Sequence, residues 1–541
     1  MRINPISLQK QSKLINDYRN NEQMIMDFFD YHPFEQSSYQ KRVQDLHERF
    51  FNREQLTKNL ATINSQWDAP DSTHANINKL RDPNSVVVIG GQQAGLLTGP
   101  MYTINKVISI IQLARQQEEE LSIPVVPVFW IAGEDHDFDE MNHIFLPKIP
   151  QMKKYKLPQQ MDQKMPVSAI KKDDVYAKQW IDTLFSQLQE TAHTKSLYHT
   201  IVDCLDKSAS YVDFFARVIF ELFPNEGVVL VDSAHPLLRQ QESGHFLAMI
   251  DNQQQISDGV YRSEQRLNQL GYATSLGVQP DDAHLFYTRG DERILLTRKD
   301  SGEWVGKQND VQVTTTQLQE IAEAQPELLS NNVVTRPLMQ EMLFPTLAFI
   351  GGPGEISYWS ALQPAFHALD MTMPPVVPRL SFTIIERHVE KLLHKYGVTP
   401  SDAVNNGVMP ERGNWLAAQN NPPISCMADQ LKRVVEEAHK PMQEVAGKIR
   451  ADLGDLAGKN LDYIFRDIDY LTKRLNKELE NKYAKELYEF DVIHASLHPN
   501  NGLQERVWNP LPWLNWHGND FIGELTNKPC SFTDEHYLVY L

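Results

Sequence analysis

Cysteine is scarce in this sequence: 541 residues include only Cys204, Cys426 and Cys530, which are far apart and odd in number. No CxxC pair or CxxC…HxxxH spacing occurs, which argues against a zinc ribbon, a redox pair and a disulfide scaffold. Long apolar runs are missing too, because no stretch reaches the roughly 18 residues that cross a membrane, and the N-terminus lacks an apolar signal segment. These absences predict a cytoplasmic protein without a membrane partner.

Positive charge is also in deficit, with 52 Lys and Arg against 70 Asp and Glu and a formal net charge of −18. Neutralising the phosphates of a nucleic acid requires clustered Lys and Arg, so a nucleic-acid partner is disfavoured. A locally basic pocket for a small anion remains compatible with this balance. Apolar residues make up 41% of the chain, enough for a sizeable core, and the length predicts several structural units.

A series of short apolar runs predicts an open parallel sheet. The run at 86–91 is β-branched and continuous, as in strands that are buried on both faces. A glycine-rich turn, a helical stretch and a second run at 123–133 follow it, which together form a βαβ unit. Further runs at 227–232 and 345–355 can extend the sheet, and 374–383 fits an edge strand or a linker. The predicted fold class is therefore an open α/β sheet.

Two long insertions separate these strands, near 151–225 and 240–335. The second contains a predicted β-hairpin at 291–307 that turns at Asp300-Ser301-Gly302. We expect the core and its insertions to occupy residues 1–390.

Residues 425–490 show apolar side chains that step by threes and fours, which is a heptad seam. The pattern runs from Leu431 to Ile449, breaks at Gly458-Lys459-Asn460 and resumes from Leu461 to Leu475. It predicts an antiparallel helical hairpin that turns at this break and is roughly 40 Å long. We therefore expect a helical coiled-coil domain at 391–495 that serves oligomerisation, and a C-terminal segment at 496–541 that returns to the core.

Candidate chemistry gathers at the predicted strand ends, where open parallel sheets bind ligands. The first motif is GGQQAGLLTGPMYTINK at 90–106, whose glycines let backbone N–H groups approach an anion at a helix N-terminus. It is neither GxGxxG nor GxxxxGK[ST], so the usual dinucleotide fingerprint and the P-loop are absent. The predicted substrate-binding residues here are Gln92, Gln93, Gly95, Gly99, Tyr102 and Lys106, and Thr98 is a predicted catalytic residue.

The second motif, WIAGEDHDFDEMNH at 130–143, places several acids around His136 just beyond a strand. His136 could act as a general base with Asp137 stabilising its charged form, so both are predicted catalytic residues. Carboxylates also suit Mg²⁺, although we predict no resident metal site. The alternative is acidic capping of the next element.

Four later segments supply further candidates. Asp232 and Ser233 follow the third strand, where no GxSxG elbow supports hydrolase chemistry, so a polar pocket wall is favoured. Arg336 could clamp a carboxylate or phosphate through its bidentate fork, or form a structural ion pair. The remaining predicted residues are Gly352 and Gly354 in a second anion-binding loop, and Trp508 and Asn509, which could bind a nucleotide by stacking or simply pack in the core.

Four motifs in this order, GGQQAGLLTGPMYTINK, WIAGEDHDFDE, VLVDSAHP and FIGGPGEISYWSAL, resemble the bacillithiol-synthesis cysteine-adding enzymes. The resemblance covers the whole chain and implies a Rossmann-like core with two connecting insertions and a coiled coil that dimerises. It also implies that L-cysteine is joined to glucosaminyl-malate through an amide bond, with ATP or ADP as the nucleotide and Mg²⁺ as its possible companion.

The residues fit this implied reaction. A free carboxylate must be activated before it forms an amide, commonly as an acyl-adenylate or acyl-phosphate, and backbone donors at a strand end can stabilise the developing charge. A base such as His136 would keep the attacking amine neutral. Two other functions stay open: a nucleotidyltransferase acting on another small carboxylic acid, and a coiled-coil scaffold that needs a partner for turnover.

Overall fold

The computed structural model describes residues 1–161, 165–274, 276–290, 292–299, 301–307, 311–420 and 422–541. Contacts divide the chain into two compact units. The first contains Met1–Leu146, Lys153–Thr383 and Glu505–Tyr540, and the second contains Pro147–Met152, Ile384–Gln504 and Leu541. Within the described residues, no helix combines the length and the apolar character needed to cross a membrane.

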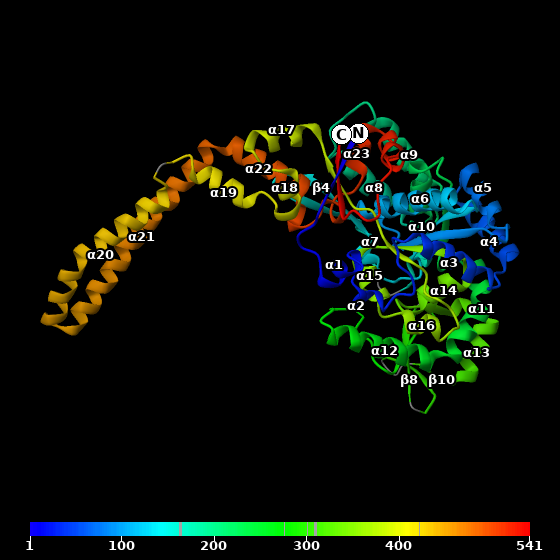
Figure 1. Cartoon of the computed structure of the whole chain (residues 1–541). Coiled ribbons are helices and arrows are strands. Elements are labelled where there is room, and N and C mark those ends of the chain that lie inside the picture. The colour runs from blue at the N-terminus through cyan, green and yellow to red at the C-terminus, as the bar shows by residue number, and fades with distance from the viewer. Residues whose placement is uncertain (162–164, 275, 291, 300, 308–310, 421) are drawn as a thin grey trace. The chain divides into compact units, whose positions relative to one another are not determined.

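A five-stranded parallel sheet forms the centre of the first unit (Figure 1). Its order is β13-β12-β2-β3-β6, and its strands are β2 (Val86–Gln92), β3 (Val125–Ile131), β6 (Val229–Asp232), β12 (Thr346–Gly351) and β13 (Val376–Pro378). Strands β3, β6 and β12 are buried along their whole length, as their continuous apolar runs predict. The predicted α/β sheet is confirmed, and the segment at 374–383 supplies an edge strand.

The direction in which the sheet grows reverses beside β2. From β2 the chain adds β3 and then β6 on one side, and it later returns to place β12 on the other side. Helix α6 (Tyr102–Leu121) follows β2, and α15 (Pro353–Trp359) follows β12. In open α/β sheets such a reversal opens a crevice at the carboxyl ends of the two strands, which is where ligands of this fold class bind.

Helices cover the sheet and protect its edge (Figure 1). Helix α6 packs on β2 and β3, while α4 (Arg53–Gln66) packs on β6. Asn64 of α4 accepts a hydrogen bond from the Leu230 N–H at 3.0 Å and donates to the Leu230 carbonyl at 2.9 Å. These two bonds occupy backbone groups that an edge strand would otherwise leave open.

The first predicted insertion forms the helices α8 (Asp174–Phe185), α9 (Thr194–Asp206) and α10 (Tyr211–Leu222). The second holds a five-stranded antiparallel sheet of order β10-β9-β8-β7-β11. Its strands are β7 (Asp282–Arg289), β8 (Glu292–Arg298), β9 (Trp304–Gly306), β10 (Gln312–Val313) and β11 (Leu329–Asn331). The antiparallel pair β8–β9 confirms the predicted hairpin, although Asp291 and Asp300 of that prediction lie outside the described residues.

The two ends of the chain meet in the first unit. Strand β1 (Arg2–Ile6) pairs antiparallel with β15 (His536–Tyr540). Further back, the Met101 N–H donates to the Trp508 carbonyl at 2.8 Å, at the start of α6. The C-terminal segment therefore packs beside the glycine-rich loop that follows β2.

The second unit is helical and contains α17 (Arg387–Tyr396), α18 (Pro400–Asn406), α19 (Met409–Ala417), α20 (Ile424–Ile449), α21 (Ala451–Lys482) and α22 (Ala484–Leu497). Helices α20 and α21 form an antiparallel hairpin (Figure 1). The turn predicted at Gly458-Lys459-Asn460 is wrong, because these residues lie inside α21 and the chain reverses at Arg450, whose backbone is extended. A Cβ on Gly454 would lie 3.2 Å from the Gly447 Cα, so the two helices approach closely at these glycines.

Only part of the predicted heptad seam lies on the face that joins α20 to α21, where Ile468 is buried. At that face His439 Nε2 lies 3.2 Å from Asn460 Oδ1, and Lys432 pairs with Asp469 at 2.6 Å. Four seam residues of α20 remain exposed, because Leu431, Met442, Val445 and Ile449 are 47% to 71% exposed. Polar contacts therefore share the hairpin interface with Ile468, and the exposed residues form an apolar row on the outside of α20.

Candidate functional site

A cavity of about 800 Å³ opens at the carboxyl ends of β2, β3, β12 and β13, where the strand order reverses. We call it the switch-point cavity. Its lining combines residues that follow four different strands with residues of the second insertion and the C-terminal segment. The lining residues are Gly91, Gln92, Gln93, Tyr102, Lys106, Ala132, Glu134, Asp135, Glu140, Asn331, Asn332, Val333, Arg336, Gly352, Pro353, Gly354, Glu355, Tyr358, Arg379 and Arg506.

Lys106 ties the ends of β2 and β12 together beneath this cavity. Its ammonium donates to the Gly91 carbonyl at 2.6 Å, to Gln92 Oε1 at 3.3 Å and to the Glu355 carboxylate. The side chain is only 1% exposed, and this burial lowers the pKa of Lys106 to about 8 although Glu355 opposes the shift. Glu355 also accepts from the Gly352 N–H at 2.7 Å, so one carboxylate joins the lysine to the second glycine loop.

Of the three arginines that line the cavity, one is already neutralised. Arg379 forms a bidentate pair with the buried Glu505, at 2.7 and 2.5 Å. Arg336 donates to the Tyr358 hydroxyl, and among the described residues neither Arg336 nor Arg506 has a carboxylate within 4 Å. Two guanidinium groups are therefore available to a carboxylate or a phosphate in the cavity.

Glu134 forms one wall of the cavity just past β3. Its Oε2 accepts from the Arg239 guanidinium and from the Asn331 N–H at 3.1 Å, whereas its Oε1 is buried without a hydrogen-bond partner among the described residues. Arg239 also pairs with Glu242 at 2.6 Å. Burial raises the pKa of Glu242 to about 7, so this buried trio holds its charge close to balance.

Seven of the predicted site residues line the switch-point cavity. They are Gln92, Gln93, Tyr102, Lys106, Arg336, Gly352 and Gly354. Gly352 does not present a free backbone donor, because Glu355 takes its N–H, and Pro353 has none. The second glycine loop is thus a wall of the cavity, and its first two backbone positions do not cradle an anion.

The middle of the first glycine-rich loop lies away from the cavity. Thr98 is fully buried, does not line the cavity and adopts a left-handed backbone with φ 71°, next to Leu97 at φ 47°. Asn509 holds this strained turn by donating to the carbonyls of Leu97 and Gly99 at 2.9 and 2.7 Å. Gly95 packs against Gly99 so closely that a Cβ would lie 2.8 Å from the Gly99 Cα.

Trp508, the other predicted nucleotide-binding residue, is buried and stacks on Trp513 with ring centroids 4.8 Å apart. Trp508 therefore packs in the core. Together, Trp508 and Asn509 support the glycine-rich loop from behind.

His136 and Asp137 follow Glu134 and Asp135 but do not line the cavity. Asp137 is exposed at the start of the short helix α7 (Phe138–Met141). His136 is half-buried, with its Nδ1 3.5 Å from Arg293 Nη1. A guanidinium only donates hydrogen bonds, so this contact favours the tautomer that carries its proton on Nε2.

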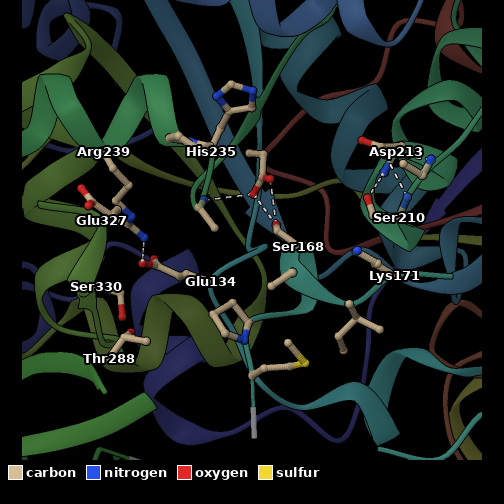
Figure 2. Close-up of a pocket in the computed structure, with 18 of the residues that line it drawn as sticks. Glu134, Ser168, Lys171, Ser210, Asp213, His235, Arg239, Thr288, Glu327 and Ser330 are labelled. Atoms are coloured by element: carbon tan, nitrogen blue, oxygen red, sulfur yellow. Dashed lines mark hydrogen bonds and ion pairs between the residues drawn. The ribbon is translucent and has the colours of Figure 1, made fainter. Parts of the chain in front are cut away.

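Asp232 is the last residue of β6 and Ser233 follows it, and neither lines the switch-point cavity. The Ser233 hydroxyl accepts from the Glu134 N–H at 3.1 Å, and Asp232 lines a second cavity of about 510 Å³ (Figure 2). Ser233 thus helps to position the residue that separates the two cavities.

Sequence reasoning missed several residues of the site. Glu134 and Asp135 belong to the motif that was singled out for His136, and Glu355 directly follows the second glycine loop, so local signals for these three were present. Asn331, Arg379 and Arg506 stand alone in the sequence, and only the fold brings them to the cavity. Within the part of the chain that the structure describes, no three His, Cys, Asp or Glu side chains are arranged to hold a metal ion.

Comparison with known proteins places the whole chain in one family. Residues 1–380 match the family described as Bacillithiol biosynthesis BshC, N-terminal Rossmann-like domain, and residues 382–541 match Bacillithiol biosynthesis BshC, C-terminal coiled-coil domain. A protein of Oceanobacillus iheyensis named "Putative cysteine ligase BshC" is 43% identical, and proteins of the same name from Bacillus cereus and Bacillus anthracis are 41% identical. Each alignment covers 100% of both chains.

Proposed function

The chain belongs to the BshC family of bacillithiol biosynthesis, and on that premise we propose that it is a carbon–nitrogen ligase that joins L-cysteine to glucosaminyl-malate through an amide bond. We assign the reaction to the switch-point cavity. The observation that carries this assignment is the presence of two arginines without carboxylate partners, Arg336 and Arg506, in the crevice where this fold class binds its ligands.

These arginines suit the anionic part of the proposed substrate. Malate contributes carboxylates, and a guanidinium binds a carboxylate through two parallel hydrogen bonds. Arg379 is unsuited to this role because Glu505 already occupies its fork. The side-chain amides of Gln92 and Gln93 lie in the same cavity and can bind sugar hydroxyls.

The chemistry requires that a carboxylate be activated before an amine attacks it. Glucosaminyl-malate has its amine on the sugar, so we propose that cysteine supplies the carboxylate and that ATP, with Mg²⁺, supplies the phosphoryl or adenylyl group that activates it. The amine nitrogen then bonds to the carboxyl carbon, the carbon–oxygen bond to phosphate breaks with its electrons on the leaving group, and the nitrogen loses a proton. Of the acidic motif, Glu134, Asp135 and Glu140 line the cavity, so they are the carboxylates of the motif that can accept that proton.

The direct test is to incubate the purified protein with glucosaminyl-malate, L-cysteine, ATP and Mg²⁺ and to detect the amide product by mass spectrometry. Release of AMP or of ADP then identifies which activated form is used. Folded protein that makes no product with or without ATP would refute the proposal.

An arginine variant tests the site itself. We expect Arg336→Gln to raise the KM for glucosaminyl-malate by about 10- to 100-fold, the range for a lost charge-assisted pair. The control is Arg262→Gln, because Arg262 is exposed on α12 (Gln253–Gln269) and its nearest carboxylate is 3.9 Å away. Equal KM values in the two variants would move the substrate away from this cavity.

A further inference from the structure

A second cavity lies beside the first, past the carboxyl end of β6 (Figure 2). We call it the Asp232 cavity. Its volume is about 510 Å³, and Figure 2 shows Ser168, Glu134 and Arg239 around it. Asp232 is only 5% exposed. The cavity therefore contains a buried carboxylate that the proposed reaction has not yet used.

The Asp232 carboxylate can accept more hydrogen bonds than its surroundings donate. The Ser168 hydroxyl lies 2.8 Å from each of its oxygens, and the Ala234 N–H donates to Oδ1 at 3.0 Å. A hydroxyl has a single proton, so it can satisfy only one of the two oxygens at a time. Burial raises the pKa of Asp232 to about 6, so the group is mostly ionised near pH 7.5.

Gly133 is required for this arrangement. A Cβ at that position would lie 1.9 Å from Ser168 Oγ and 2.1 Å from Asp232 Oδ1. The Ser168 N–H also donates to the Gly133 carbonyl at 3.0 Å. The backbone past β3 therefore leaves just enough room for the serine and the carboxylate to face each other.

The other charged groups that line the cavity divide into those with partners and those without. Asp213 is fully used, because it accepts from the N–H groups of Ala209 and Ser210 and from the Trp67 indole at 2.8 to 3.1 Å. Arg239 is bound by two carboxylates. Glu134 has a side chain only 3% exposed and an Oε1 without a partner among the described residues.

Glu134 is also the one described residue that lines both cavities. Lys171 also lines the Asp232 cavity as an exposed cation, whereas the buried part of this cavity offers the acceptor oxygens of Asp232 and Glu134, next to a wall shared with the switch-point cavity. This chemistry suits a primary ammonium group.

We propose that the Asp232 cavity binds the α-amino acid substrate, with its ammonium group on Asp232 and Ser168 and its carboxyl group toward the wall that this cavity shares with the switch-point cavity. The inference rests on the proposed function and adds to it: the two substrates occupy different cavities and meet at Glu134. The sugar amine approaches that wall from the switch-point cavity.

The test is calorimetric titration of the full-length protein with L-cysteine and with 3-mercaptopropionate, which lacks the amine, and ATP is left out so that no turnover occurs. We expect 3-mercaptopropionate to bind at least about tenfold more weakly than L-cysteine to the wild type. Asp232→Asn should weaken L-cysteine binding by about 10- to 100-fold and leave glucosaminyl-malate binding unchanged. Ser168→Ala should weaken L-cysteine binding by a smaller factor, which keeps the test valid if Asp232→Asn fails to fold.

Glu327→Gln is the matched control, because Glu327 is an exposed carboxylate on the same cavity and should be replaceable without effect on L-cysteine. Undiminished L-cysteine affinity in folded Asp232→Asn and Ser168→Ala, or equal binding of the two ligands by the wild type, would overturn this inference and leave the proposed ligase intact. A wild type that binds neither amino acid nor glucosaminyl-malate would overturn both proposals.

Discussion

Lys106→Met should abolish activity but change the free energy of unfolding only slightly. The pH dependence of unfolding should show that the charged, buried lysine is itself unfavourable in the folded chain. Burial lowers the pKa of Lys106 from 10.5 to about 8, so its charged form is less favourable in the folded chain than in the unfolded one. Each pKa unit corresponds to about 1.4 kcal/mol, so the charged lysine costs about 3 kcal/mol at pH 7. Methionine removes that cost but leaves Glu355 and the Gly91 carbonyl without their donor.

The sign of the pH effect follows from linkage. Between about pH 8 and pH 10.5 the unfolded lysine binds a proton that the folded lysine has lost, so stability rises with pH in this window. From pH 7 to pH 9 the gain in the free energy of unfolding is about 1.3 kcal/mol for the wild type, and Lys106→Met should lack this gain.

The assay is urea unfolding followed by tryptophan fluorescence at pH 7 and pH 9, for the wild type and the variant. Lys79→Met is the control, because Lys79 and its partner Glu118 are both about 40% exposed and solvent screens such pairs. The same pH gain in the wild type and in Lys106→Met would refute the reasoning, as would a loss of more than about 3 kcal/mol at pH 7.

Three further predictions test other parts of the molecule. Burial lowers the pKa of His536 to about 4, so stability should fall by about 2 kcal/mol on going from pH 7 to pH 5 as the unfolded histidine takes up a proton, and urea unfolding of His536→Gln should lack this part of the loss. The exposed apolar row on α20 should be covered in a homodimer. The double variant Met442→Asp, Ile449→Asp should therefore be monomeric by light scattering and keep the helical circular dichroism of the wild type. A dimer that persists in this variant would place the interface elsewhere. Asn509→Ala should release the strained turn at Leu97 and Gly99, because it removes both hydrogen bonds from Asn509. We expect a lower kcat and a loss of about 1–3 kcal/mol in the free energy of thermal unfolding. Unchanged values of both would show that the turn keeps its conformation without Asn509.

Local signals in the sequence were enough to predict the sheet and to point to the edge at which the switch-point cavity lies. The runs that became β2, β3, β6 and β12 are continuous and apolar because both faces of a parallel strand are covered. Once the sheet is predicted, its carboxyl edge is the place to look for ligands, and seven predicted residues do line the cavity there.

The sequence could not show which side chains of a loop or helix face the cavity and which pack inside the protein. Within one loop, Gln92 and Gln93 line the cavity whereas Thr98 is buried under a turn held by Asn509, more than 400 positions away in the chain. The helical hairpin shows the same limit, because the glycine at 458 suggested a turn, while the actual reversal at Arg450 depends on how closely Gly447 and Gly454 let the helices approach. Spacing identifies the residues of an element, but packing between elements decides which of them face the ligand.

Two ion pairs at the carboxyl edge of the sheet decide which cations of the cavity are neutralised. Lys106–Glu355 joins β2 to β12, and Arg379–Glu505 joins β13 to the C-terminal segment. Buried pairs of this kind rarely stabilise a fold more than apolar side chains of the same size would, so stability alone does not account for them. Their effect on the cavity accounts for them better. Each pair neutralises a cation at the carboxyl edge, so Arg336 and Arg506 remain as the arginines that a ligand can bind. In a chain with a net charge of −18, we expect these pairs to determine where in the cavity an anion binds.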